Sequence, residues 1–346
     1  MKRQLPARLT MAALALSVAS LPLQGCAAQS ASDGGVGQTG PATPAQGAAM
    51  PPEIAAMEAH FAAYRAMPDT PGTGAYPATK QVDPRLPDHT VYRPADLVKV
   101  GKNGLAIVGW GNGGCANDGA SDRLHLLEIA SHGYIVIAPG AIKSGPGVAK
   151  QPTFEPGRAL GADTTAQQVM QGIEWAIAEN DRPESPYYQK LDPSRIAVSG
   201  YSCGGVQALS LASDPRVKAV VIHNSGLFPD GVNPIAGVTT SKSWLSRLHT
   251  PVVYIEGGKS DIAYGNGMDD FSRITHVPAM MLNLDVGHGG TFHQPNGGLA
   301  AMAAVNWLEW QLRGSAKAAK LFEGTDCVLC SDPRWTVERK NWPPQR

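Results

Sequence analysis

The sequence predicts an α/β fold with a mostly parallel central sheet and helices on both of its faces. The first observation is a regular alternation of short apolar segments with longer segments of helical periodicity, from about residue 90 to residue 312. The second is that the apolar segments are nearly continuous, as is typical of parallel strands that are buried on both faces. The third is the length of 346 residues, which suffices for one large domain with a substantial core.

The expected elements follow one another in the order of a strand–helix repeat. The expected strands cover residues 105–108, 134–138, 195–199, 217–222, 252–256 and 279–284. The expected helices cover residues 53–67, 121–131 with Ser121 as N-cap, 163–179, 204–212 and 300–312. The turn-rich residues 68–87 are expected to wrap the surface. The Gly- and Pro-rich residues 141–162 are expected to form a long connection on the substrate side.

The composition narrows the class of protein. Lys and Arg together number 29, as do Asp and Glu, so the formal net charge is zero. The chain therefore lacks the basic field of a nucleic-acid-binding protein, and no nucleic-acid partner is expected. Charged residues make up only 17% of the chain, which also has 39 Gly and 28 Pro. This composition favours a loop-rich globular enzyme over a coiled coil or a helical scaffold.

The first 26 residues are expected to be a signal peptide of the lipoprotein type. An apolar segment at 11–18 is too short for a convincing membrane span, and positive charges precede it at Lys2, Arg3 and Arg8. The segment ends in Leu-Gln-Gly-Cys, which resembles a bacterial lipobox with Cys26 as the lipidated residue, although Gln24 is unusual at its position. The alternative is ordinary signal cleavage a few residues later.

The predicted destination and domain boundaries follow from this assignment. Ala27, behind the predicted lipidated cysteine, is not the Asp that retains lipoproteins in the inner membrane. We therefore expect an outer-membrane lipoprotein that faces the periplasm or the cell surface, and otherwise a periplasmic or secreted protein. Residues 27–50 are rich in Ala, Gly, Ser, Pro and Gln and are expected to be a flexible linker. Residues 51–346 then form the folded domain.

The pentapeptide Gly-Tyr-Ser-Cys-Gly at 200–204 matches the pattern G-x-S-x-G. The pattern alone is weak, so its context carries the argument. An expected strand ends directly before it and an expected helix begins directly after it, which predicts a sharp turn that exposes the serine hydroxyl. Ser202 is therefore the predicted nucleophile. The alternative is a Gly-rich turn with an incidental serine.

A serine needs a base to become an effective nucleophile. In folds with this turn, the chain order is serine, acid, histidine. His288 directly follows the expected strand 279–284 and stands among small residues that leave room for its ring to reach Ser202. His288 is therefore the predicted base. The runner-up is His293, then His276, while His223 within an expected strand is read as a packed histidine.

The acid of such a triad ends the preceding strand. Asp261 follows the expected strand 252–256 by a short Gly-rich turn, so it is the predicted acid that orients the imidazole. Glu256, within the strand end, and Asp285, three residues before the predicted base, remain alternatives.

The oxyanion of an acyl-transfer intermediate needs preorganised N–H donors. One is the amide of Cys203, the residue after the nucleophile, at a helix N-terminus. The other is expected from the loop at 109–115, Gly-Trp-Gly-Asn-Gly-Gly-Cys, with the amide of Trp110 first and that of Gly111 close behind. The Trp110 side chain is either a wall of the acyl site or an aromatic packed under the loop.

Export permits disulfides. Apart from Cys26, the four remaining cysteines allow three pairings. Cys327 and Cys330 are close enough for a short local bridge, and a zinc site is weakly supported because no second pair matches. Cys115 and Cys203 lie on elements that approach the same oxyanion, which suggests a bridge between them. Two buried free thiols are the alternative.

The motifs of this chain resemble those of the α/β-hydrolase superfamily over roughly residues 90–315. More narrowly, the chain is similar to bacterial polyester-hydrolase and dienelactone-hydrolase-like esterases, in which the last helix leads into a segment like 318–322. The resemblance implies an α/β-hydrolase fold and acyl transfer through an acyl-enzyme, with no metal and no cofactor. Tyr201 and Cys203 differ from the His or Met often found beside the nucleophile, and the oxyanion loop lacks a His-Gly-Gly run, so the substrate is left open.

The predicted function is that of a secreted serine carboxylic-ester hydrolase acting on a small-molecule or polymeric ester. Short-chain, aromatic and polyester-type esters all fit, and a lipid anchor would tie the enzyme to a membrane. One alternative is a serine peptidase of the same fold. Another is a non-catalytic lipoprotein that kept the fold for binding.

Overall fold

In a computed structural model, the described residues are 59, 62–149 and 161–342. The predicted signal peptide, its lipidation residue Cys26 and the linker 27–50 lie outside the described residues, as do residues 150–160 of the expected substrate-side loop. All described residues belong to the compact unit Met50–Arg346. Of the expected helix 53–67, residues 59 and 62–66 are helical.

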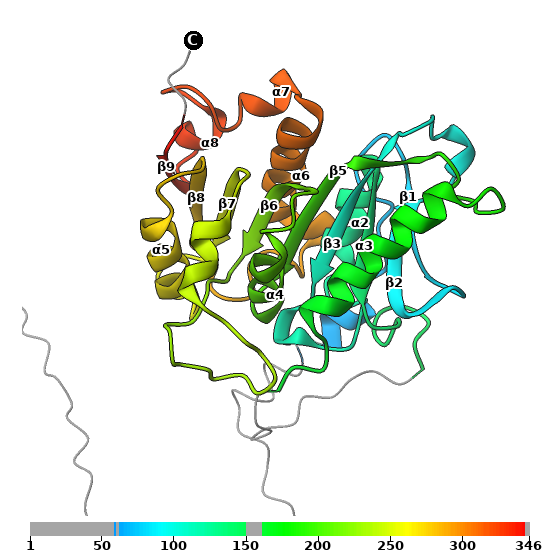
Figure 1. The fold of residues 1–346 in the computed structure, drawn as a ribbon, viewed down its shortest axis with the longest axis horizontal. Coiled ribbons are helices and arrows are strands. Elements are labelled where there is room, and N and C mark those ends of the chain that lie inside the picture. The colour runs from blue at the N-terminus through cyan, green and yellow to red at the C-terminus, as the bar shows by residue number, and fades with distance from the viewer. Residues whose placement is uncertain (1–58, 60–61, 150–160, 343–346) are drawn as a thin grey trace, which may run out of the picture. The chain divides into compact units, whose positions relative to one another are not determined.

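The described residues form a nine-stranded sheet in the order β1-β2-β4-β3-β5-β6-β7-β8-β9 (Figure 1). The strands from β4 to β8 in this order are parallel to one another, whereas β1, β2 and β9 pair antiparallel at the edges. The mostly parallel sheet confirms the predicted fold class. The strand bounds are β1 Ala78–Asp83, β2 Leu86–Pro94, β3 Leu105–Gly111, β4 Tyr134–Pro139, β5 Leu191–Tyr201, β6 Val217–His223, β7 Val252–Glu256, β8 Ala279–Leu284 and β9 Trp335–Lys340.

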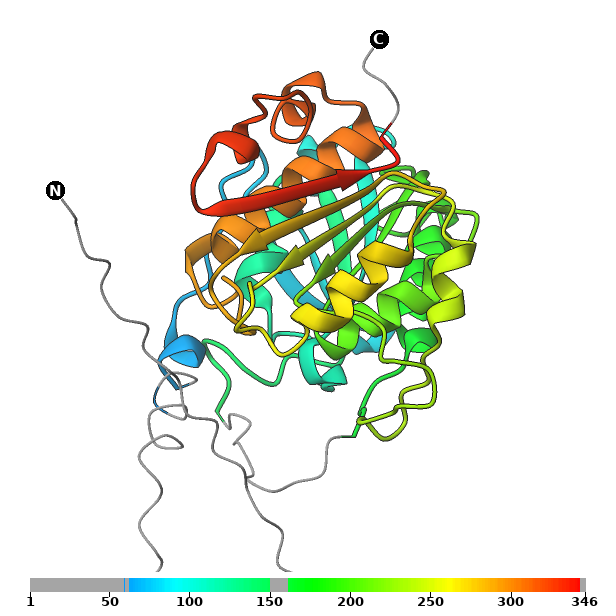
Figure 2. The same cartoon turned by 90° about the vertical axis from the view of Figure 1, so that its left-hand side faces the viewer.

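Helices cover both faces of the sheet, as Figure 2 shows from the side. One core packs α3, α4 and α5 on the sheet through residues such as Ile173, Val206 and Phe271. The other packs α2 and α6 through residues such as Leu127 and Trp307. The bounds are α2 Arg123–Ser131, α3 Ala166–Asp181, α4 Cys203–Leu211, α5 Tyr264–Arg273, α6 Gly298–Arg313, α7 Ala316–Ala319 and α8 Val328–Ser331, with 3-10 turns at η1 Leu97–Lys99, η2 Gly113–Cys115, η3 Lys242–Arg247 and η4 Pro295–Gly297.

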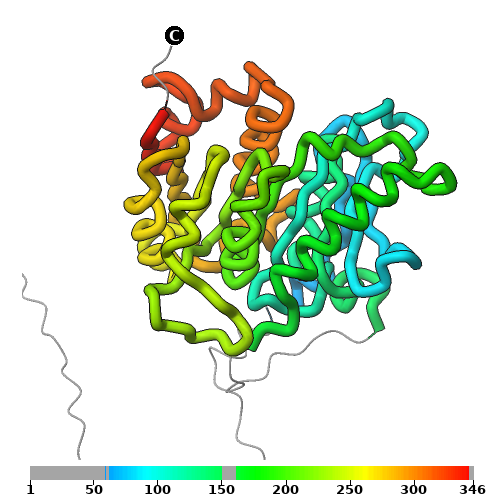
Figure 3. The backbone as a smooth tube through the Cα atoms, in the orientation of Figure 1, coloured from blue at the N-terminus to red at the C-terminus, as the bar shows by residue number. Residues whose placement is uncertain are grey.

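The sheet edges are where the structure departs most from the sequence-based expectation. β1 and β2 occupy one edge and β9 the other (Figure 3). Residues 78–83 were expected in a surface turn region, but they pair antiparallel with β2. β9 reaches β8 from the far end of the chain. Edge strands are less apolar than central ones, and their partners are set by tertiary packing, so their periodicity is weak.

Two helix predictions also need correction. Ser121 is not the N-cap of α2: that position belongs to Asp122, whose side chain makes no capping bond and turns instead toward Trp110. The helix α5 was missed, because glycines at 265 and 267 weaken the helical signal of a polar segment. The other predicted strands and helices from residue 105 onward are present, with ends that shift by a few residues.

Candidate active site

Ser202 lies on the sharp turn between β5 and α4, as the G-x-S-x-G pattern predicts. Its backbone has φ 52° and ψ −121°, a conformation that L-residues adopt rarely and that marks a strained turn. The turn is crowded: a Cβ on Gly200 would lie 2.2 Å from the Gly204 carbonyl oxygen, and one on Gly204 would lie 2.0 Å from that of Gly111. The flanking glycines are therefore required by close backbone approach.

Besides the Gly205 amide, which donates to the Ser202 carbonyl at 2.9 Å, two groups of β6 and the loop after it hold the Ser202 backbone in this conformation. Its N–H donates to the carbonyl of His223 at 3.0 Å, at the end of the neighbouring strand β6. Its carbonyl accepts the hydroxyl of Ser225 at 2.6 Å. The strained turn is thus braced from the next strand, which keeps the serine hydroxyl in a defined place.

The structure brings Ser202, His288 and Asp261 into one hydrogen-bonded chain. The Ser202 Oγ lies 2.9 Å from Nε2 of His288, and Nδ1 of the same ring lies 2.6 Å from Oδ1 of Asp261. Each residue follows a different strand of the parallel sheet, namely β5, β7 and β8. The carboxyl ends of these strands meet at one edge of the sheet, which is why residues far apart in sequence converge.

Asp261 is buried and accepts several hydrogen bonds. Besides His288, its donors are the side-chain amide of Asn224 at 2.8 Å and the backbone amides of Ala263 at 2.8 Å and Gly257 at 3.1 Å. Burial by itself raises the pKa of this carboxyl, but the hydrogen bonds from His288, Ala263 and Asn224 outweigh it and lower the pKa below its ordinary value. The carboxylate is therefore ionised and fixed in orientation.

The other histidines weighed for the base role lie elsewhere. The ring of His293 stacks on that of Tyr64 with centroids 4.0 Å apart. Nε2 of His276 is 2.8 Å from the carbonyl oxygen of Leu248. His223 is buried in β6, and burial lowers its pKa well below the ordinary value, so it is the packed histidine that the sequence predicts.

The two alternative acids do not reach His288 through a hydrogen bond. Glu256 is buried at the end of β7, accepts the amide of Ser225 at 3.1 Å, and has a pKa raised well above the ordinary value by burial. Asp285 is exposed, and its side chain lies beside Gly258. Of the three acids that the sequence proposes, only Asp261 is positioned to orient the imidazole.

The Trp110 side chain is not a wall of the acyl site. β3 runs on to Gly111, so Trp110 lies within the strand opposite Ser199, and its side chain is fully buried. The indole Nε1 donates to Oδ2 of Asp122 at 3.2 Å. This is the packed-aromatic alternative. β3 extends further than predicted, so Trp110 belongs to the strand and its side chain points into the hydrophobic core. Gly113, two residues beyond the end of β3, lines the pocket beside His288.

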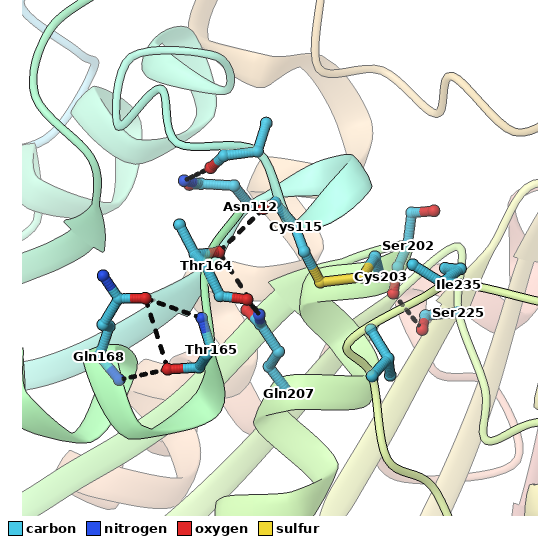
Figure 4. The surroundings of a disulfide bond; sticks show 12 residues. Asn112, Cys115, Thr164, Thr165, Gln168, Ser202, Cys203, Gln207, Ser225 and Ile235 are labelled. Carbon is cyan, nitrogen blue, oxygen red and sulfur yellow. Dashed lines mark hydrogen bonds between the residues drawn. A yellow bond between two sulfur atoms is a disulfide. The ribbon is translucent and has the colours of Figure 1, made fainter. Parts of the chain in front are cut away.

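A disulfide joins Cys115 to Cys203, the first residue of the nucleophile helix (Figure 4). The Cys115 carbonyl also accepts the amide and the hydroxyl of Thr164, each at 3.0 Å, and the Thr164 carbonyl accepts the Gln207 side-chain amide at 2.7 Å. The predicted bridge between the oxyanion loop and the nucleophile turn is present, together with the predicted local bridge Cys327–Cys330.

A pocket of about 470 Å³ opens beside His288. Its wall includes Tyr201 and Gly113 from the nucleophile turn and the oxyanion loop, and Tyr64 and Arg65 from the segment before β1. Sequence reasoning missed this N-terminal wall. A helical pattern was visible there, but nothing in it indicated which face of the domain the segment would cover.

The N-terminal wall is anchored by polar contacts to the start of α2. The Tyr64 hydroxyl donates to the carbonyl of Ser121 at 2.6 Å. The buried guanidinium of Arg123 donates to the carbonyls of Tyr64 at 2.9 Å and Met67 at 2.6 Å, and its Nε pairs with Asp69 at 2.9 Å. The wall is thus a fixed part of the pocket.

The sheet, the strained serine turn and the converging side chains define a hydrolase of the α/β-hydrolase fold. A family model described as PETase, PET hydrolase-like, matches residues 125–309, which is more than half of the chain and contains Ser202, Asp261 and His288. The chain therefore belongs to the PET hydrolase-like family, and it is a serine carboxylic-ester hydrolase. This confirms the resemblance inferred from the motifs. A comparison with curated proteins found no match.

Proposed function

We propose that this enzyme hydrolyses esters through an acyl-enzyme on Ser202, with His288 as general base and Asp261 as its orienting acid. The observation that carries the proposal is the continuous chain of hydrogen bonds from Oγ through the imidazole to the carboxylate, at 2.9 and 2.6 Å. Both distances are within reach for proton transfer and orientation. The strained backbone of the serine matches the exposed nucleophile of a strand–turn–helix motif.

The steps follow from this geometry. Oγ of Ser202 attacks the ester carbonyl carbon while Nε2 of His288 takes its proton, and the imidazolium that forms is stabilised by Asp261. The tetrahedral intermediate collapses, the alcohol leaves with that proton, and the acyl group remains on the serine oxygen. Water then attacks the acyl-enzyme with the same base, which releases the carboxylic acid and restores the serine.

Backbone amides are the groups that we assign to stabilising the oxyanion of each intermediate. Cys203 is the first residue of α4, and the amide of a first helical residue has no intrahelical acceptor. The second donor remains a prediction from the loop at 109–115. Trp110 lies in strand β3, and Gly113 lies at the pocket surface with its amide donating to the Asp122 carboxyl.

The pocket supports an ester with an apolar or aromatic body. The rings of Tyr64, Tyr201 and His293 border it next to the proposed base. Short-chain, aromatic and polyester-type substrates fit this lining. Polyester substrates have the additional support of the PET hydrolase-like family.

The proposal is tested by comparing wild type with Ser202→Ala on p-nitrophenyl acetate, p-nitrophenyl butyrate and a polyester film, together with labelling by a fluorophosphonate probe. We expect ester hydrolysis and labelling in wild type and loss of both in the variant. The matched control is Ser272→Ala, an exposed serine of α5 whose hydroxyl donates to the Asp269 carbonyl at 2.7 Å. Hydrolysis that survives Ser202→Ala would overturn the mechanism.

The two other functions have distinct outcomes in the same assay. A serine peptidase of this fold would cleave peptide amides at rates comparable with those for esters and would lose both in Ser202→Ala. A binding protein that kept the fold would show neither hydrolysis nor labelling. The hydrogen-bonded chain of Ser202, His288 and Asp261 favours the ester hydrolase over the binding protein.

We also propose that the chain is exported and lipidated at Cys26, which lies outside the described residues. The support is the charged start and apolar segment of the N-terminus, and the two disulfides of the folded domain, which are typical of an oxidising compartment. No helix within the described ranges is long and apolar enough to cross a membrane. Metabolic labelling with a radioactive fatty acid should mark wild type and spare Cys26→Ser, and labelling of both would contradict the assignment.

A further inference from the structure

Three consecutive residues at the end of β6 contact every part of the proposed triad. The carbonyl of His223 accepts the amide of Ser202, and the hydroxyl of Ser225 donates to the carbonyl of the same serine (Figure 4). Asn224 lies between them, and its side chain contacts two other segments. One is the acid loop, residues 257–263, and the other is the histidine loop, residues 285–290, which carries His288.

The side-chain amide of Asn224 bonds both loops at once. Its Nδ2 donates to Oδ2 of Asp261 at 2.8 Å and to the carbonyl oxygen of Gly287, the residue before His288, at 3.2 Å. A carboxylate and a backbone carbonyl only accept hydrogen bonds, so the NH2 group of the amide must face them. One atom of Asn224 therefore connects the proposed acid to the loop of the proposed base.

The two loops are packed tightly around this amide. The Gly287 amide donates to the carbonyl of Gly257 at 2.8 Å. A Cβ on Gly257 would clash with the Gly287 carbonyl oxygen and lie 2.8 Å from Nδ2 of Asn224. Asn224 is only 1% exposed. It is therefore enclosed between the loops and acts on the reaction through other residues, without touching the substrate.

The backbone of Asn224 is strained. Its φ of 45° lies in the left-handed region, which glycine adopts freely and asparagine tolerates better than most other residues. Its N–H donates to the Ile255 carbonyl in β7 at 2.9 Å, which holds the chain in this conformation. A glycine would fit here with less strain, so the contribution of the asparagine lies in the bonds of its side chain.

Asn224 supplies a neutral donor to a buried carboxylate. Burial raises the pKa of Asp261, and the Asn224 amide is one of the hydrogen bonds that lower it. Glu256 at the end of β7 and Tyr201 beside the serine also interact with Asp261, but burial raises the pKa of both, so neither adds a charge at neutral pH. A cationic donor would compete with imidazolium for the carboxylate, whereas a neutral amide does not.

We propose that Asn224 is a positioning residue of the hydrolase, which ties the acid loop to the histidine loop and so holds Asp261 and His288 in fixed relative positions. This rests on the proposed ester hydrolysis through Ser202. The amide fixes Oδ2 of Asp261, so Oδ1 stays directed at Nδ1 of His288. Loss of the amide lets the acid and the base shift relative to each other, which lowers turnover while substrate binding is kept.

The first test compares Asn224→Gly with the matched control Asn341→Gly. Asn341 has a φ of 56°, and its side-chain amide also bonds two acceptors, the carbonyls of Ile274 at 3.1 Å and Val277 at 3.0 Å. It directly follows β9 at the sheet edge. Glycine suits the left-handed backbone at both positions, so each variant loses one amide and its two hydrogen bonds without new strain.

The two variants should differ in turnover. We expect kcat for p-nitrophenyl acetate to fall about 100-fold in Asn224→Gly, because a misplaced acid and base lose the geometry that proton transfer needs. KM should stay within about threefold of wild type, since the residue does not touch substrate. Asn341→Gly should keep kcat within about twofold. Urea denaturation midpoints of both variants show how much of any change follows from stability alone.

A pH profile of Asn224→Asp tests the need for a donor at this place. The introduced carboxyl has the shape of the amide. When protonated it can donate one hydrogen bond to Asp261, and when ionised it donates none and repels that carboxylate. Two carboxyls that share one site do not both ionise readily, so one keeps its proton to higher pH.

The expected profiles of wild type and Asn224→Asp therefore differ at alkaline pH. Wild type should reach a level kcat/KM, whereas kcat/KM of the variant should pass through a maximum and then fall as the introduced carboxyl ionises. Because the protonated form keeps the shape and one hydrogen bond of the amide, this variant tests the inference even if Asn224→Gly folds poorly.

The outcomes separate this inference from the proposed function. A kcat of Asn224→Gly within about threefold of wild type, equal losses of kcat in Asn224→Gly and Asn341→Gly, or a kcat/KM of Asn224→Asp that matches wild type at every pH would overturn the positioning role. If wild type meanwhile hydrolyses p-nitrophenyl acetate and Ser202→Ala does not, the ester hydrolase itself stands. Hydrolysis that is independent of Ser202 would overturn both.

Discussion

Asp261 and Asp122 are two buried aspartates of the active-site region with opposite electrostatics. Both are 4% exposed and both accept three or more hydrogen bonds. Yet the pKa of Asp261 is lowered, whereas burial raises the pKa of Asp122 from its ordinary 3.8 to about 6 despite its hydrogen bonds. Asp261 faces an imidazole, which can carry positive charge, whereas the donors of Asp122 are neutral and the nearby Asp118 raises its pKa further.

This contrast teaches that burial and hydrogen bonding do not by themselves define a catalytic carboxylate. Asp261 is held ionised, which suits a group that stabilises imidazolium. Asp122 bonds the Trp110 indole and the Gly113 amide, so its role is to hold the end of β3 and the loop after it.

The largest expected effect is on turnover. Asp261→Asn should lower kcat about 10⁴-fold, because an amide favours the wrong imidazole tautomer and leaves imidazolium unstabilised. Asp122→Asn should lower kcat no more than about tenfold, because the amide oxygen can still accept the Gly113 N–H. Steady-state kinetics on p-nitrophenyl acetate measure both. Similar losses in the two variants would contradict the distinction.

The second effect concerns the disulfide between Cys203 and Cys115, which lies in the loop that Asp122 helps to hold. The Cys115–Cys203 bridge spans 88 residues and the Cys327–Cys330 bridge spans 3. Loop-closure entropy predicts that replacing the first pair by serines lowers the free energy of unfolding by about 4–5 kcal/mol, and replacing the second by about 2 kcal/mol.

Urea denaturation of the two double variants measures this difference. The long bridge also fixes the turn that carries Cys203, so kcat should fall only when that bridge is removed. The Cys327→Ser/Cys330→Ser variant is the matched control. A loss of kcat in the control, or equal losses of stability, would show that the long bridge has no special role at the site.

The third effect is the dependence of stability on pH. The pKa of Asp122 is higher in the folded state than in the unfolded chain, so its contribution favours folding below about pH 4 and is lost as the pH rises through about 6. Relative to Asp122→Asn, wild type should lose up to about 3 kcal/mol over this range.

Asp261 should show the opposite sign. Its pKa is lowered on folding, so its contribution is present above about pH 4 and is lost as the pH falls below that value. Urea denaturation at a series of pH values, always as the difference between wild type and variant, isolates each carboxyl from other titrating groups such as the buried His223. Slopes of the same sign for Asp261→Asn and Asp122→Asn would refute the assignment.

The smallest expected effect is on stability, at the N-terminal wall. Tyr64 of this wall is hydrogen-bonded to Ser121, the residue before Asp122. Tyr64→Phe removes the hydrogen bond from the Tyr64 hydroxyl to the Ser121 carbonyl and should lower the free energy of unfolding by about 1 kcal/mol. The ring and its stacking on His293 remain, so kcat should stay within about twofold. A large loss of kcat would mean that this hydroxyl takes part in catalysis.

Much of the candidate site could be predicted from local sequence. Ser202, Asp261 and His288 each follow a short apolar strand, in the chain order expected for this fold, and parallel strands bring their carboxyl ends to one edge. Trp110 shows where this reasoning ends. The residue type suggested either a wall or a packed aromatic, and only the length of β3 decided between them.

The sequence by itself determined the strand–helix repeat, the nucleophile turn and the identity of the three converging side chains. These features rest on local periodicity, on glycines that a crowded turn requires, and on chain order. Tertiary structure alone decided the edge strands, the choice between a bridge and two free thiols at Cys115 and Cys203, and the N-terminal wall at Tyr64. Each of these depends on which distant segments pack together, and no short-range pattern encodes that choice.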